Sequence, residues 1–205
     1  MRQNTRRAQT RMLTELAVLS AIIIVLQSGS VALTVFAGIT PVSLVLIPIV
    51  LGAVRHGSKA GAFLGFVFGV ITLIWGIVGA DAFTNLLFSA HPVITSLLCL
   101  VKSTVAGFVS GLLYKLLKSK NQYLALYVAT ILAPTVNTGI FILGGLTMLD
   151  TLKTIPGSEG MSIIYFLVVV IALKNYIFEL LVNILFAPAL KRVLDILTKK
   201  QKTAP

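Results

Sequence analysis

The stretch Ala90–Tyr114, AHPVITSLLCLVKSTVAGFVSGLLY, sets the interpretation of the whole chain. It is apolar on both sides of Lys102, and residues Ala82 to Val101 include no Asp, Glu, Lys or Arg. A helix of this length crosses a bilayer, with Lys102 roughly 15 Å from either end at about 1.5 Å per residue. A charge at that depth is costly, so we expect Lys102 to face a bundle interior or a wet cavity.

The composition is that of a membrane protein. Of the 205 residues, 57% are hydrophobic and 11% are charged, whereas about a quarter of a soluble domain is charged. The net charge of +11 would by itself suggest nucleic-acid binding. The basic residues, however, are dispersed in short loops between apolar runs, which the positive-inside rule explains better. We therefore predict an all-α integral membrane protein embedded in a lipid bilayer, with no nucleic-acid partner.

Charged and turn-forming residues divide the chain into six predicted transmembrane helices. Leu16 to Val54 is uncharged and too long for one span, and the segments Gln27–Ser30 and Gly38–Pro41 are typical of turns. We predict two short helices here, joined by a loop folded at or within the membrane surface. The six spans form a single domain over residues 1–205 and are predicted at about 12–26, 41–54, 60–78, 92–117, 122–146 and 161–190.

The basic residues are distributed asymmetrically across these spans. With six spans, one side of the membrane receives 14 of the 17 Lys and Arg residues, while the loops of the other side receive only Lys153. Loops rich in Lys and Arg stay in the cytoplasm. We therefore predict that both termini are cytoplasmic. The 14 residues are Arg2, Arg6, Arg7, Arg11, Arg55, Lys59, Lys115, Lys118, Lys120, Lys191, Arg192, Lys199, Lys200 and Lys202.

Small residues one helical turn apart mark two predicted contact faces. Gly61, Gly65 and Gly69 are spaced by four in the third span, which lets a neighbouring backbone approach closely. Ala17 and Ala21 have the same spacing in the first span. Spacing alone favours internal packing for this alanine pair, and the alternative is a docking surface for a separate membrane subunit.

Lys102 has two possible roles. It either pairs with a buried carboxylate, for which Glu179 is the candidate within the spans, or neutralises an anionic ligand that enters from outside. Glu179 is expected to lie deeper, near the cytoplasmic end of the last span. We therefore favour the ligand.

Further polar residues are candidate ligand contacts. Pro134 interrupts the fifth span, and two interpretations of the Thr and Asn side chains that follow it are equally open: a hydrogen-bonding wall, or a plain kink with satisfied side chains. In the last span, Asn175 shares a face with Glu179 and Asn183, and a bridging role and a ligand role are equally open for it. Asn85 and His91, which precede the fourth span, are a possible entrance to the binding site. A lone His before a proline, however, more often just begins a helix. The predicted substrate-binding residues are Lys102, Asn137, Thr138, Asn175, Asn85 and His91.

The sequence lacks motifs for catalysis. It contains no phosphate-cradling Gly-Lys-Ser/Thr loop, so we expect any ATP hydrolysis to be done by other subunits. We find no cluster with metal-ligand spacing and no Ser/His/Asp set placed for nucleophilic attack. We predict that the chain is not an enzyme and has no catalytic residues, metal or cofactor.

The chain resembles the S components of energy-coupling factor (ECF) transporters over nearly its whole length. The resemblance rests on about 200 residues in six spans, the Ala17-x-x-x-Ala21 motif in a short first helix, and a ligand-facing lysine. S components are the substrate-capturing subunits of bacterial vitamin importers of the ABC transporter class. The resemblance implies a multi-pass protein of the plasma membrane. It also implies that Ala17 and Ala21 dock on a transmembrane coupling subunit (EcfT-like), driven by two ABC ATPases (EcfA-like).

Within that family, four segments are most similar to the pantothenate-specific members, namely 44–52, 60–69, 137–141 and 175–183. Pantothenate carries one carboxylate, one amide and two hydroxyls, which one lysine and several Asn and Thr side chains would satisfy. Thiamine or riboflavin would need more aromatic stacking than an 8% aromatic share suggests. Biotin, niacin and other anionic vitamins remain alternatives.

The resemblance also implies a mechanism. The vitamin would bind from outside beneath two loops that act as lids, Gln27–Thr40 and Gly79–His91, and the S component would then rotate in the membrane to release it inside. The alternative is a stand-alone secondary transporter or channel for a small organic anion. That alternative predicts gradient-driven flux by the chain alone in liposomes.

Overall fold

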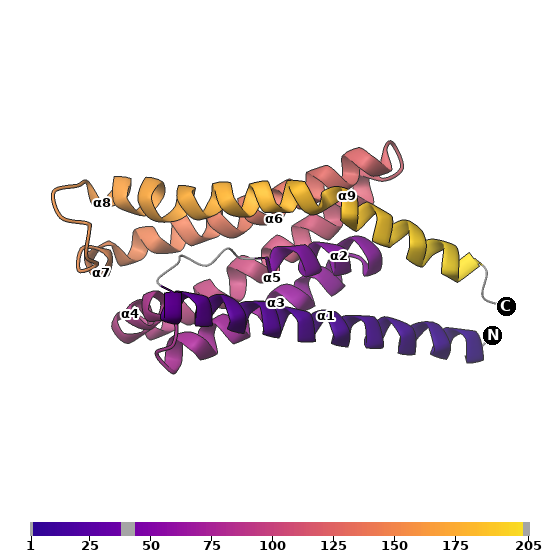
Figure 1. The fold of residues 1–205 in the computed structure, drawn as a ribbon, viewed down its shortest axis with the longest axis horizontal. Coiled ribbons are helices and arrows are strands. Elements are labelled where there is room, and N and C mark those ends of the chain that lie inside the picture. The colour runs from indigo at the N-terminus through magenta and orange to yellow at the C-terminus, as the bar shows by residue number, and fades with distance from the viewer. Residues whose placement is uncertain (1, 38–43, 203–205) are drawn as a thin grey trace.

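The fold is all-helical over the part of the chain that the structure, a computed structural model, describes: residues 2–37 and 44–202. The long helices lie roughly side by side, and the first turn of α1 and the last of α9 lie at the same end of the bundle (Figure 1). The elements are α1 (Arg2–Ala37), α2 (Leu46–His56), α3 (Ser58–Ile77), α4 (Ala82–Ala90), α5 (Pro92–Leu117), α6 (Gln122–Gly145), the 3₁₀ turn η1 (Leu146–Met148), α7 (Leu149–Leu152), α8 (Ile163–Tyr165), the π-helix η2 (Phe166–Leu173) and α9 (Lys174–Lys202).

Five helical segments in the described residues are long and apolar enough to cross a membrane. They are Gln9–Leu33, Ser58–Ile77, Pro92–Leu117, Gln122–Leu152 and Ile163–Ile196. The second predicted span corresponds to α2, which has 11 residues and is shorter than the ~20 that a membrane crossing needs. A multi-pass membrane protein follows from these helices, while the sixth span stays a prediction.

The predicted turn at Gln27–Ser30 is wrong, because α1 continues through it to Ala37. Gln27 and Ser30 are both buried, so packing of this face overrides the local turn preference. The other predicted turn, Gly38–Pro41, and the predicted start of the second helix lie outside the described residues. The next helix, α2, begins at Leu46 and extends to His56.

The predicted loop Gly79–His91 is also wrong, because most of it forms α4. Asp81 is the N-cap: its carboxylate accepts hydrogen bonds from the backbone N–H and the hydroxyl of Thr84, at 3.1 and 2.7 Å. The last predicted span differs too, since it starts with α8 at Ile163, passes through eight π-helical residues and extends as α9 to Lys202.

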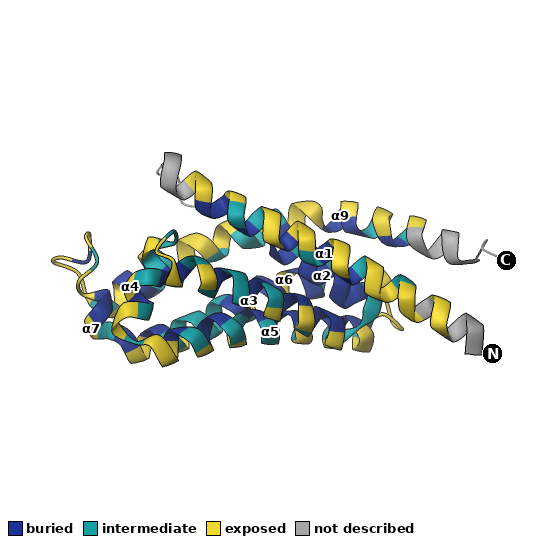
Figure 2. Ribbon diagram, turned by 90° about the horizontal axis from the view of Figure 1, so that it is seen from below, coloured by how far each residue is buried: buried dark blue, intermediate teal, exposed yellow. Residues whose placement is uncertain are grey.

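The short helix α2 is the centre of the bundle. One of its sides packs with α1 and α3 in a core that includes Leu46 and Ile49, and the other packs with α5, α6 and α9 around Val50 and Val54. Figure 2 shows burial as a stripe along the inner side of the long helices, with exposed residues facing outward. The helix is therefore held by protein on several sides.

The predicted close contact at the glycine row is confirmed. Gly61, Gly65 and Gly69 of α3 lie against the backbone of α5, and a methyl group on any of them would come within 3.0 Å of an α5 carbonyl oxygen. For Gly65 that oxygen belongs to Ser103, the neighbour of Lys102. The glycine row thus fixes the depth and rotation of the helix segment that carries the lysine.

Candidate functional site

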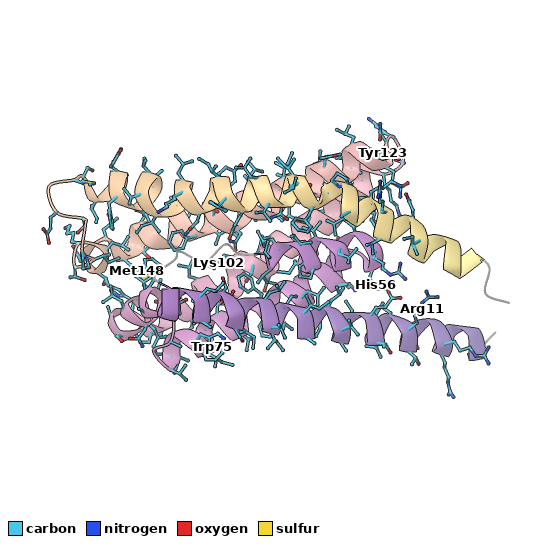
Figure 3. The ribbon with its side chains drawn as sticks, in the orientation of Figure 1. Arg11, His56, Trp75, Lys102, Tyr123 and Met148 are labelled. Carbon is cyan, nitrogen blue, oxygen red and sulfur yellow. The ribbon has the colours of Figure 1, made fainter. Side chains whose placement is uncertain are left out.

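Lys102 projects from the middle of α5 and is half-buried within the bundle (Figure 3). Its ammonium lies over the ring of Phe141 on α6, 5.4 Å from the ring centroid, which is a cation–π distance. Among the described residues, no carboxylate lies within the 4.0 Å that would make an ion pair with this ammonium. The ring of Phe141 therefore stabilises the positive charge of Lys102, while the N–H donors of the ammonium are available to a ligand.

A carboxyl group from α9 lies within electrostatic range of this ammonium. The Oε2 atom of Glu179 is buried and has no hydrogen-bond partner among the described residues. Lys102 acts on this carboxyl group electrostatically, and the side chain of Asn137 faces it. The expectation that Glu179 lies too deep to be near Lys102 is therefore wrong, although the two do not form an ion pair.

The π-helix η2 is one physical reason for that difference. In a π-helix the hydrogen bonds span five residues, so the helix is wider and advances less per residue than an α-helix. Eight such residues immediately precede α9, and they place Glu179 nearer the α8 end of the bundle than an α-helical count suggests. π-helical segments are frequent at functional sites, and no simple sequence pattern marks them.

Asn137 of α6 completes the group. It is only 7% exposed, and its Oδ1 atom has no partner in the described structure. Buried polar atoms in folded proteins are nearly always hydrogen-bonded, so two orphaned oxygens in the neighbourhood of an unpaired ammonium form a candidate site for a polar ligand. We refer to Lys102, Asn137, Phe141 and Glu179 as the polar cluster.

The other predicted binding residues lie in different surroundings. Thr138 is half-buried on α6 and Asn175 is exposed on α9. The side-chain amide of Asn85 donates to the carbonyl of Gly76 at 2.8 Å, tying α4 to α3. His91 stands between α4 and α5, where its backbone N–H closes α4. The Asn85 side chain and the His91 backbone therefore serve the α3–α4–α5 connection in this structure.

Sequence reasoning missed two members of the polar cluster as ligand contacts. Phe141 lies four residues after Asn137 and therefore on the same face of α6, a spacing that the sequence does display. For Glu179, the sequence suggests only an ion pair with Lys102. Asn183 is fully buried and donates to the backbone carbonyl of Glu179 at 2.8 Å, within α9 itself, while its Oδ1 atom has no partner among the described residues.

A family model described as the substrate-specific component of ECF transporters matches residues 11–191. The chain belongs to this family. Searches of curated proteins and of solved structures find no match. The S-component family consists of transporter subunits rather than enzymes, which work with an EcfT-like subunit and EcfA-like ATPases on a small-molecule substrate. A multi-pass membrane location follows from the family and the apolar helices together.

The first helix of this S component has one buried and one exposed face. Leu16, Leu19 and Ile23 pack into the core, whereas Ala17 and Ala21 are both exposed. Exposed large apolar residues lie beside the alanines on α1, among them Leu13, Val18 and Val25. Within the described chain, the alanine pair is therefore not engaged in internal packing.

An ionic cluster joins α1 to the end of α2. Glu15 accepts hydrogen bonds from Nε and Nη2 of Arg55, the second at 2.7 Å, and lies 2.8 Å from Nε2 of His56. Arg11, one turn earlier on α1, also donates to Glu15 at 3.1 Å. The Arg55 side chain is only 8% exposed, so leaving its positive charge without this carboxylate would be costly.

Proposed function

We propose that this S component captures a small anionic vitamin, with pantothenate as the best candidate, from the outer side of a bacterial plasma membrane. The observation that carries the proposal is the ammonium of Lys102, which lies in mid-helix without a carboxylate partner in the described structure. An unpaired charge at that depth costs several kcal/mol, of the order of 2.5–3.5 kcal/mol on insertion scales. A bound anion would remove much of that cost.

The chemistry of the polar cluster suits more than a bare anion. Lys102 offers donors to a carboxylate, while the orphaned oxygens of Glu179 and Asn137 offer acceptors to hydroxyl or amide N–H groups. Phe141 supplies an apolar face. Pantothenate combines a carboxylate with one amide and two hydroxyls, whereas niacin has a carboxylate but no such donors. The balance of donors and acceptors therefore favours pantothenate over niacin.

The exposed alanine face supports the docking part of the proposal. We propose that Ala17 and Ala21 contact the EcfT-like subunit, because small exposed residues one turn apart let another helix approach closely. The common end of α1 and α9 would face the cytoplasm, where the basic residues gather. Rotation of the docked subunit in the membrane would then release the vitamin inside.

The test begins with mass spectrometry of small molecules retained on the gently purified chain, followed by titration with pantothenate. Lys102→Ala should weaken binding about 10- to 100-fold, because a hydrogen bond to a charged group contributes about 1.5–3 kcal/mol. Lys174→Ala, which removes an exposed lysine from α9, is the matched control and should bind normally. Equal retention by the wild type and Lys102→Ala would remove the basis of the proposal.

A further inference from the structure

A basic cavity lies far from the polar cluster, in the half of the bundle nearer the two chain ends. It has a volume of about 270 Å³, and its lining includes Arg55, His56, Tyr114, Lys118 and Gln122. Figure 3 shows His56 well along the bundle from Lys102, toward the chain ends. The 16 residues from Lys102 to Lys118 correspond to roughly 24 Å of helix. The two sites are therefore separate.

Hydrogen bonds hold the residues that line this basic cavity in place. Two nitrogens of Arg55 and one of His56 bond to Glu15, which fixes both side chains at the end of α2. The side-chain amide of Gln122 donates to the hydroxyl of Tyr114 at 3.4 Å. Glu15 carries one negative charge, but Arg11 bonds to the same carboxylate as Arg55. The side chains around the cavity therefore keep a net positive charge.

Lys118 is the cavity's exposed cation. It follows the last residue of α5, and it makes no ion pair with the described carboxylates. The cavity also lies where α6 begins, although the Asn121 side chain already accepts hydrogen bonds from the backbone N–H groups of Tyr123 and Leu124. A guanidinium and an ammonium around one hollow are groups that recognise phosphate.

We infer that the basic cavity binds a phosphate group carried by the headgroup of an anionic phospholipid. Basic pockets between transmembrane helices, on the side rich in Lys and Arg, take such headgroups. The cavity is slightly smaller than the roughly 300–1,000 Å³ of pockets for drug-sized ligands, so it fits a headgroup rather than a nucleotide. Exposed apolar side chains on the adjoining helix ends, Leu116 and Leu124, provide surface for acyl chains.

Native mass spectrometry of the full chain, released from nanodiscs of phosphatidylcholine with one-fifth phosphatidylglycerol, tests the inference. Lys118→Ala should retain about fivefold less phosphatidylglycerol than the wild type, the loss expected for one lysine near an anionic headgroup. Lys118→Arg should restore retention. Lys120→Ala is the matched control, because Lys120 is exposed in the next turn and is not part of the lining.

A second arm identifies the source of the phosphate. The melting temperature of delipidated protein is measured with and without 10 mM inorganic phosphate. A phosphate-dependent rise that Lys118→Ala abolishes and Lys120→Ala keeps, without any difference in lipid retention, would assign the cavity to free phosphate. Lipid loss of equal size in both alanine variants would show general surface attraction and would overturn the inference. The inference would also be overturned if Lys118→Ala had no specific effect on either lipid retention or the phosphate-dependent melting temperature.

Discussion

Replacing Gly65 by alanine tests how the α3–α5 contact positions Lys102. The added methyl group would collide with the carbonyl oxygen and carbonyl carbon of Ser103 and with the Cα atom of Thr104. All three are backbone atoms, so no flexible side chain can move aside. The α5 backbone would have to retreat by roughly 1 Å to restore normal van der Waals separation.

The expected cost follows from this geometry. Overpacking a well-packed contact typically costs about 1–3 kcal/mol. Gly139→Ala is the matched control, because Gly139 is also within a helix but has open space where its Cβ would be. That change should stabilise the protein by about 0.5–1 kcal/mol, since glycine loses more backbone entropy on folding than alanine. The same entropic gain applies at Gly65, so the two variants should differ by the overpacking cost alone, about 1–3 kcal/mol.

The assay is equilibrium unfolding of the purified protein in detergent, paired with titration of pantothenate. Gly65→Ala should unfold more easily than the wild type. It should also bind more weakly, because a shift of about 1 Å in a supporting helix is enough to loosen a binding site. If Gly65→Ala is as stable as Gly139→Ala, the α3–α5 contact is not as close as described and the positioning role of the glycine row is refuted.

Two further predictions concern α1. Replacing Ala17 and Ala21 together by leucine should abolish vitamin uptake by the assembled transporter while leaving binding by the isolated subunit intact; equal loss of both activities would count against the docking face. Glu15→Ala should lower the free energy of unfolding by about 1–3 kcal/mol, because it leaves Arg55 largely buried without its carboxylate. Thr14→Ala, a change at an exposed neighbouring position, is the control, and equal melting temperatures for the two variants would contradict the role of the ionic cluster.

Much of the polar cluster follows from single-helix arguments. The depth of Lys102 comes from counting residues along α5, and Asn137 and Phe141 share a face of α6 by their spacing. The exposure of Asn175 and the bond from Asn85 to Gly76 do not follow from such counting. They depend on how each helix is rotated in the bundle and on α4, which forms where the sequence suggests a loop.

The sequence by itself determined the membrane class, the approximate ranges of α3, α5 and α6, and the close contact at the glycine row. These properties depend on residue size and apolarity along one helix, which a linear pattern records directly. Only the tertiary structure decided that Glu179 lies within electrostatic range of Lys102, that α1 continues past Ser30, and that Arg55 lines a cavity. These depend on which faces of distant helices meet and on a change in helix type, and neither is encoded in local spacing.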